Sequence, residues 1–126
     1  MIVLDTHAWI WTVANPSKLS LPARRRIAAE QTLGVPVICT WETAMLVARG
    51  RLQLDRDVLT WVRDALGQPK VTLLPLTPEI AVTSVGIELH GDPSDRIIVA
   101  TALDRASDLV TADRDIRRAG VVRCVW

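Results

Sequence analysis

Short runs of β-branched and other apolar residues alternate along the chain with longer runs in which apolar positions recur at helical spacing. Runs of the first kind fit strands that are buried on both faces, and runs of the second kind fit helices that cover those faces. This alternation is typical of a three-layer α/β/α fold with a mostly parallel central sheet. The pattern predicts strands at residues 2–4, 35–39, 71–76, 108–111 and 121–125.

Capping residues predict where the helices between these strands begin and end. Ser, Thr and Asp favour helix N-termini because their side-chain oxygens accept hydrogen bonds from free backbone N–H groups, and Gly often follows a helix end. Proline is favoured in the first turn. We therefore expect helices from Ser20 to Gly34, from Thr40 to Gly50, from Asp55 to Gly67 and from Thr77 to His90.

Length and composition narrow the class of protein. A chain of 126 residues fits a single domain, residues 1–126, and its 15 Lys and Arg against 14 Asp and Glu give no overall charge that would indicate a nucleic-acid or membrane partner. No apolar run reaches the roughly 20 residues of a membrane-spanning helix, and the N-terminus lacks the basic segment of a signal peptide. Cys39 and Cys124 lie in apolar, strand-like runs that fit buried, reduced thiols of a cytosolic protein.

Acidic residues adjoin the predicted elements at four distant places. Asp5 ends the first strand, Glu42 lies just past the second, Asp95 opens the helix RIIVATAL, and Asp113 follows the strand DLVT. Ligands of open α/β sheets bind at the carboxyl ends of the strands, where these acids would converge. Two like charges about 4 Å apart repel by roughly 4 kcal/mol at an effective dielectric near 20. A hard divalent cation with a preference for oxygen, Mg²⁺ or Mn²⁺, would offset this repulsion.

Several of these acids also fit helix capping. Asp92 with Pro93 is a typical N-cap and first-turn pair, and Asp95 fits the reciprocal position of a capping box. Asp113 and Asp115 both fit the positive end of a short following helix. Capping accounts for each acid alone, whereas a metal site accounts for four acids at equivalent strand ends.

Four motifs in this order resemble those of PIN-domain proteins of the VapC toxin kind: IVLDTHAWIW, TWET, GDPSDRIIVATA and LVTADRDI. The resemblance extends over the whole chain. It implies a PIN-like fold and a ribonuclease that depends on Mg²⁺ or Mn²⁺, acting as the toxin of a toxin–antitoxin pair. It also implies an RNA substrate, a VapB-type antitoxin as partner, a homodimer and no membrane association.

The resemblance also assigns roles to single residues. The acids that it places in the active site are Asp5, Glu42, Asp95 and Asp113. All except Glu42 are implied metal ligands, and Glu42 would help to bind metal or orient the attacking water. Thr6 or Thr111 would hold a water or a phosphate oxygen. Asp115 competes with Asp113 for the last position, and Asp113 is favoured because it stands two residues after Thr111.

RNA is a polyanion, so an acidic site needs basic residues nearby that attract its phosphates. Arg96 directly follows Asp95, although a local salt bridge explains that neighbour equally well. The run ARRRIAAE also fits a solvated helix surface. Further candidates for RNA contact are Arg24, Arg25, Arg26, Arg49, Arg51, Arg114, Arg117 and Arg118.

The five tryptophans are the only aromatic side chains of the Phe, Tyr and Trp class. Trp9 and Trp11 are two residues apart on a predicted helix, so we expect one in the core and the other in a groove or a subunit interface. Trp41 and Trp61 are expected in the core.

Other proteins also gather acids at the edge of an α/β sheet. A receiver domain needs a lysine at the end of a late strand, whereas the lysines here are Lys18 and Lys70. A haloacid-dehalogenase-type phosphatase needs a second Asp two residues after the first, where this chain has His7. Neither histidine has an evident acid–base partner in the sequence, and His7 is expected to contribute to packing or to support the site residues from behind. The remaining alternative is an inactive PIN-like module that binds RNA or protein.

Overall fold

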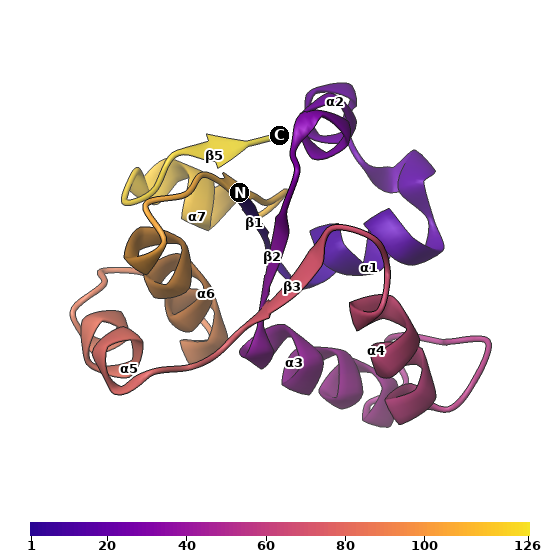
Figure 1. Cartoon of the computed structure of the whole chain (residues 1–126). Coiled ribbons are helices and arrows are strands. Elements are labelled where there is room, and N and C mark those ends of the chain that lie inside the picture. Colours follow the sequence, from indigo (N-terminus) through magenta and orange to yellow (C-terminus); the bar gives the residue numbers. More distant parts are fainter.

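The computed structural model describes residues 1–126, in which strands and helices follow one another around one central sheet (Figure 1). The elements in chain order are β1 (Ile2–Leu4), α1 (Thr6–Ala14), a 3₁₀ turn η1 (Pro16–Lys18), α2 (Leu21–Ala29), β2 (Leu33–Pro36), α3 (Val37–Ala48), α4 (Val58–Leu66), β3 (Val71–Leu74), α5 (Pro78–Val85), α6 (Pro93–Asp104), β4 (Leu109–Val110), α7 (Arg114–Ala119) and β5 (Cys124–Val125).

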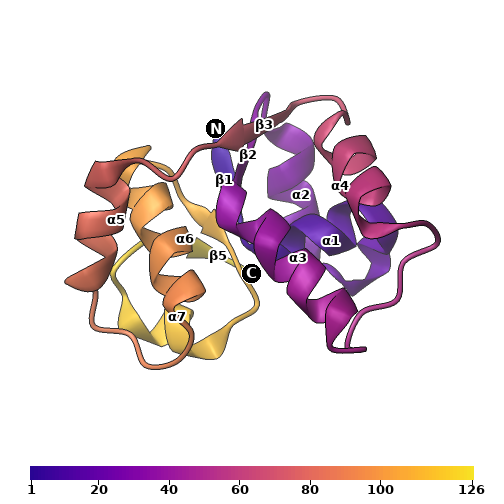
Figure 2. The ribbon, with the colours of Figure 1, turned by 90° about the horizontal axis from the view of Figure 1, so that it is seen from below.

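The five strands are all parallel and lie in the order β3-β2-β1-β4-β5. The helices α5, α6 and α7 lie on one side of this sheet, and α1, α2 and α4 lie on the other (Figures 1 and 2). The predicted α/β/α fold with a parallel sheet is therefore confirmed. Because β1 and β4 are buried on both faces, the sheet forms the centre of the hydrophobic core.

Three predicted helix starts are confirmed by their capping hydrogen bonds. Ser20, Thr77 and Asp92 accept from the backbone N–H groups of Ala23, Ile80 and Ser94, respectively. The predicted start at Asp55 is wrong by two residues. The Asp55 carboxylate is bound by Arg56, and Asp57 caps α4 through the N–H of Thr60.

The predicted ends of two helices lie too far along the chain. The helix α2 ends at Ala29 because Glu30 turns to an extended backbone, and Gly34 lies in β2 instead. The helix α5 ends at Val85, and residues 86–92 form the connection to α6, so His90 is in a loop.

The predicted second strand is displaced toward the N-terminus. The structure places β2 at Leu33–Pro36, and Val37, Ile38 and Cys39 form the first turn of α3. Thr40 therefore does not cap a helix; its hydroxyl donates to the Val37 carbonyl inside α3 at 2.7 Å. The β-branched residues favour a strand locally, and the tertiary packing of α3 against α1, α4 and α6 overrides that preference.

The tryptophans divide between the core and the surface. Trp9 and Trp61 are buried with ring centroids 5.4 Å apart, as expected for core residues. Trp11 is half-buried and packs beside Trp126. The core position expected for Trp41 is wrong, because its side chain is 54% exposed.

Both cysteines are free thiols, buried for Cys39 and partly buried for Cys124. Cys39 lies on a helix and not on the expected strand. None of the helices has the length and apolar character needed to cross a bilayer.

Candidate active site

The centre of the sheet creates a cavity at its carboxyl edge. The strands β2 and β4 lie on opposite sides of β1, so the segments that follow β1 and β4 diverge at this edge. Such a switch point is where open α/β sheets bind ligands. Asp5 follows β1 and Thr111 follows β4, so both lie at this point.

Asp5 is buried at the start of α1 and held by two hydrogen bonds. Its Oδ1 accepts from the Ala8 N–H at 2.8 Å, and its Oδ2 accepts from the Thr111 hydroxyl at 2.5 Å. Only 8% of Asp5 is exposed. Burial raises the pKa of this carboxyl group, and the bonds from Thr111 and Ala8 oppose that rise. Thr111 therefore fixes the orientation of the Asp5 carboxylate.

Thr111 also connects Asp5 to Asp113. The Thr111 oxygen accepts from the Asp113 N–H at 3.1 Å. Asp113 caps α7 through the N–H groups of Asp115 and Ile116, and it lines the cavity as well. Capping and site roles thus coincide at Asp113. Asp115 is exposed and does not line the cavity, so the geometry favours Asp113 as the last acid.

Glu42 reaches the cavity from the middle of α3, whereas the sequence placed it at a helix start. Its Oε1 accepts from the Thr6 hydroxyl at 2.5 Å, and Thr6 itself is buried. Thr6 therefore orients Glu42 as Thr111 orients Asp5. This pairing leaves Oε2 of Glu42 available for another donor.

Asp95, in the first turn of α6, is a second carboxyl group of the site with a raised pKa. Burial raises its pKa to about 7, with further contributions from Glu42, Asp113, Asp92 and Asp5. The expected capping box is not formed, because Asp92 alone caps α6 with its side chain. The Asp95 carboxylate instead lines the cavity with four like charges around it and no cation paired to it.

The four predicted acids and Asp92 line one cavity of about 480 Å³, which we call the acidic cavity. Asp92 thus combines its expected capping role with a place in the cavity wall. The cationic side chains of the lining are Arg49 and Arg51. The full lining consists of Asp5, Thr6, His7, Trp11, Glu42, Met45, Leu46, Arg49, Arg51, Asp92, Asp95, Ile98, Ala112 and Asp113.

Sequence reasoning named Arg49 only as one of several basic candidates and did not place it in the cavity. The signal was present in the spacing of α3, because Glu42, Met45, Leu46 and Arg49 recur at helical intervals on one face. His7 also lines the cavity and is exposed beside Trp11, where a role in packing or in support of the site residues was expected for it.

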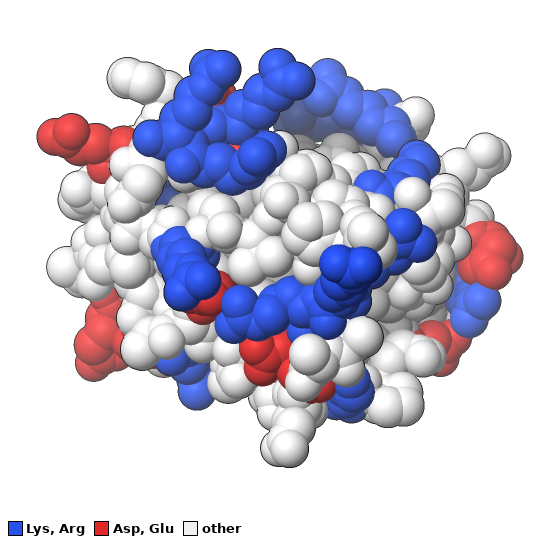
Figure 3. Space-filling model, turned by 90° about the horizontal axis from the view of Figure 1, so that it is seen from above, with Lys and Arg blue, Asp and Glu red and all other residues white.

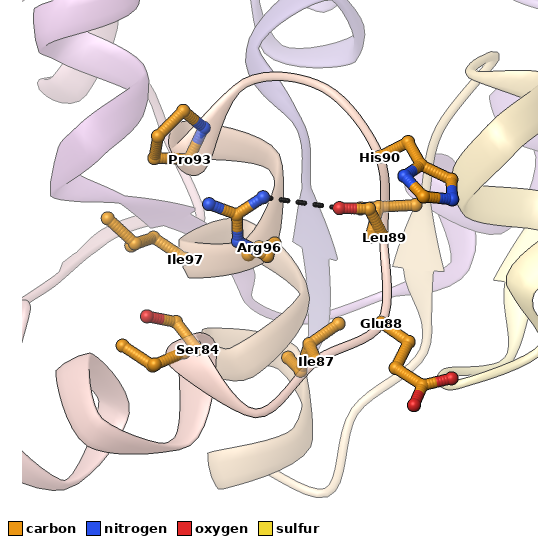
Figure 4. A pocket seen from close by; sticks show the side chains of 9 residues that line it. Ser84, Ile87, Glu88, Leu89, His90, Pro93, Arg96 and Ile97 are labelled. Atoms are coloured by element: carbon orange, nitrogen blue, oxygen red, sulfur yellow. Dashed lines mark hydrogen bonds between the residues drawn. The ribbon is translucent and has the colours of Figure 1, made fainter.

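Arg96 does not line the acidic cavity, and the alternative of a local salt bridge with Asp95 is wrong. Its predicted contact with RNA stays a prediction. It forms no salt bridge with Asp95, its neighbour in sequence. Its guanidinium donates to the Leu89 carbonyl at 3.2 Å in a second pocket between α5 and α6, as Figure 4 shows. Consecutive residues on α6 project in different directions, so Asp95 and Arg96 line separate pockets.

The donors of the acidic cavity suit a hard cation. They are carboxylate oxygens with one nearby imidazole, and Mg²⁺ and Mn²⁺ prefer oxygen ligands. No three or more acidic, His or Cys side chains are arranged in this structure as a cage that could hold a metal ion. Mg²⁺ commonly takes one or two carboxylates and keeps several waters, so its binding does not require such a cage. Asp5, Asp95 and Asp113, with Glu42, are the residues available to hold it.

Comparison with known proteins connects this geometry to a family. The family profile described as PIN domain matches residues 2–122. The chain is 36% identical over 118 residues to Ribonuclease VapC22 of Mycobacterium tuberculosis (strain ATCC 25618 / H37Rv), an alignment that covers 92% of this chain and 89% of the relative.

Solved structures share the fold at low sequence identity. The VapBC2 structure from Rickettsia felis, bound to a promoter DNA fragment, has a TM-score of 0.72 at 13% identity and covers 98% of this chain and 97% of that chain. DNA-bound VapBC from Salmonella typhimurium has a TM-score of 0.72 at 19% identity, with the same coverage. FitAcB from Neisseria gonorrhoeae has a TM-score of 0.67 at 18% identity and covers 98% and 96%. With its profile match from residue 2 to residue 122, this chain belongs to the PIN-domain family.

Proposed function

We propose that this protein is an endoribonuclease dependent on Mg²⁺ or Mn²⁺ and the toxin of a toxin–antitoxin pair. The observation that carries this proposal is the convergence of Asp5, Glu42, Asp95 and Asp113 in one cavity at the switch point of the sheet. The 36% identity to a VapC ribonuclease supports RNA as the substrate.

Hydrolysis of a phosphodiester needs an activated water and stabilisation of negative charge on the phosphate. A divalent cation, when bound by Asp5, Asp95 and Asp113, would supply a Lewis acid and lower the pKa of water. Within the chain, Thr111 keeps Asp5 aimed into the cavity through its 2.5 Å hydrogen bond. Thr6 holds Oε1 of Glu42, so that Oε2 accepts a hydrogen bond from the attacking water.

The proposal is tested by cleavage of a mixed pool of single-stranded RNA by the purified protein with Mn²⁺ and with EDTA. We expect Asp113→Asn to lower kcat/KM by about 10²-fold, because it removes a charged oxygen from the site. Asparagine still caps a helix, so α7 is preserved. The matched control is Asp115→Asn, which removes the same charge outside the cavity and leaves cleavage unchanged.

The inactive-module alternative makes the opposite prediction. A wild-type protein that cuts no RNA in the presence of Mn²⁺, or that cuts it equally well in EDTA, would contradict the proposed enzyme. Equal losses from Asp113→Asn and Asp115→Asn would remove the acidic cavity from the mechanism.

The proposed protein partner is a VapB-type antitoxin. One structural neighbour, from Klebsiella pneumoniae, is described as a toxin–antitoxin complex, and others are described as VapBC bound to DNA. The acidic cavity offers five carboxylates beside half-buried Trp11, which suits an apolar helix that ends in an arginine. Of the two candidates for a groove residue, Trp9 and Trp11, the choice falls on Trp11, because Trp9 is fully buried.

Expression in the native host tests this partnership. We expect the chain alone to arrest growth and co-expression of the protein encoded beside its gene to restore it. Replacement of the inserting arginine of that partner by alanine should weaken inhibition more than binding. A chain that is harmless alone contradicts the toxin assignment.

A further inference from the structure

Another hollow on the surface is lined by arginines and contains no acid. It has a volume of about 530 Å³ and is lined by Arg114, Arg117, Arg118 and Cys124, between α7 and β5. The three arginines are exposed and form no salt bridge. We call this feature the arginine hollow. Figure 3 shows the face of the molecule that carries α2 and β5, where Lys and Arg side chains form large groups and Asp and Glu are sparse.

The spacing of these arginines places their charges together. Residues at i, i+3 and i+4 share one face of a helix, so Arg114, Arg117 and Arg118 repel one another along α7. Arg24 and Arg25 on α2 are also exposed and unpaired, whereas other basic candidates have different surroundings. Arg26 pairs with Glu30 and Asp108, and Arg49 lies within the acidic cavity. The arginine hollow therefore offers unpaired positive charge to an anion from outside.

The arginine hollow adjoins the acidic cavity through the chain itself. Asp113 lines the cavity and Arg114, the next residue, lines the hollow. Consecutive Cα atoms are about 3.8 Å apart. Along the axis of α7, Arg118 lies about 6 Å beyond Arg114. The linings of the acidic cavity and of the arginine hollow therefore begin at neighbouring residues of the chain.

We infer that the arginine hollow binds the phosphate backbone of the RNA next to the bond that is cut, with Arg117 and Arg118 as its outer contacts. This inference rests on the proposed ribonuclease function. Because guanidinium groups bind phosphate through several donors and carry no base readout here, the contribution is to affinity and to positioning of the strand.

Binding of a fluorescein-labelled, single-stranded RNA of mixed sequence tests the inference, with Asp95→Asn in every protein so that the probe stays intact. We expect Arg117→Ala/Arg118→Ala to weaken binding about 10-fold at low salt and to reduce the slope of log K against log[salt] by about 1.4, which corresponds to two lost phosphate contacts. The charge-conserving Arg117→Lys/Arg118→Lys should retain the slope. The control pair Lys18→Ala/Arg63→Ala removes two exposed cations from the ends of η1 and α4, across the sheet from α7 (Figure 1), and should leave both quantities unchanged.

Cleavage kinetics separate this inference from the proposed function. In the otherwise wild-type protein, the double alanine variant should raise KM about 10-fold and leave kcat nearly constant, as expected for lost binding that is uniform between substrate and transition state. If the wild type cuts no RNA, the proposed function fails and the binding data alone judge the arginine hollow. If the wild type cuts RNA and the double variant matches the control pair in KM and salt slope, only the inference fails. The arginine hollow would then fit an acidic protein partner and not RNA.

Cys124 provides a test that does not depend on removing charge. Its thiol lines the arginine hollow, whereas Cys39 is fully buried. Burial raises the pKa of Cys124, so alkylation is followed at alkaline pH. We expect the RNA probe to slow alkylation of Cys124 in the Asp95→Asn protein, and an unchanged rate at saturating RNA would overturn the inference.

Discussion

The acidic cavity and the pocket between α5 and α6 are similar in size and different in charge. Their volumes are about 480 and 580 Å³. The acidic cavity collects five carboxylates from the starts of α1, α6 and α7 and from α3, whereas the larger pocket has Glu88 as its only acid and Arg96 already bonded to a carbonyl. The difference teaches that the convergence of unneutralised charge, and not volume, distinguishes the candidate functional site of this molecule.

The largest expected effect uses two neighbours that face these two pockets. Asp95→Asn should lower RNA cleavage by about 10²-fold, because it removes a charged oxygen from the acidic cavity. Arg96→Ala should leave kcat/KM within about twofold and lower the free energy of unfolding by about 1 kcal/mol, the usual contribution of one hydrogen bond. Cleavage rates and denaturant unfolding of both variants measure the contrast. A loss of activity in Arg96→Ala as large as in Asp95→Asn would break the comparison.

A smaller loss is expected for the hydroxyl that orients Glu42. Thr6→Val keeps the shape of the side chain and removes the donor at 2.5 Å, so we expect kcat to fall about 10-fold through misplacement of the carboxylate. Ser84→Ala is the matched control in the α5–α6 pocket, where the hydroxyl bonds only to the Ala81 carbonyl. Steady-state kinetics should show a change in the first variant alone.

Cation binding should stabilise the protein through the acidic cavity only. At a Mg²⁺ or Mn²⁺ concentration ten times the Kd, mass action adds about 1.4 kcal/mol to the free energy of unfolding. We expect thermal melting to show this gain in the wild type and in Arg96→Ala, and to show little of it in Asp95→Asn. An equal gain in all three proteins would place the cation elsewhere.

The smallest expected effect is the pH dependence of the metal-free protein. The folded pKa of Asp95 is raised to about 7, so between pH 4 and 7 the folded state holds a proton that the unfolded state has released. Stability from this group therefore falls as pH rises through this range and is constant above it. Because Asp95 is partly exposed, solvent screening limits the cost to the order of 1 kcal/mol.

Asp95→Asn isolates this contribution. In metal-free buffer the variant should be more stable than the wild type at pH 8, and the advantage should shrink at pH 5. Urea unfolding at the two pH values measures it. A constant difference between the two proteins across this range would contradict the raised pKa of Asp95.

The site was more predictable from the sequence than the boundaries of the elements were. Asp5 and Asp113 follow short buried strands, and strand ends in a parallel sheet converge wherever the exact helix limits lie. The segment from Val37 to Cys39 shows the opposite case. Its β-branched residues favour a strand, whereas the packing of α3 against α1, α4 and α6 stabilises a helix there.

Directions of side chains were the least predictable feature. Arg96 follows Asp95 in sequence but lines the pocket between α5 and α6. Trp41 precedes the cavity-lining Glu42, and its side chain is exposed. On a helix, adjacent residues point about 100° apart, so two neighbours in sequence can face different pockets. The bonds from Thr6 to Glu42 and from Thr111 to Asp5 span 36 and 106 residues and become visible only in three dimensions.

The most direct test of the central claim is the position of a bound cation in the acidic cavity. Crystals of the wild-type protein grown with Mn²⁺ and measured by anomalous diffraction would locate it. The account predicts an anomalous peak bounded by the carboxylates of Asp5, Asp95 and Asp113. Strong Mn²⁺ peaks confined to other parts of the surface, with the acidic cavity holding water alone at saturating Mn²⁺, would contradict it.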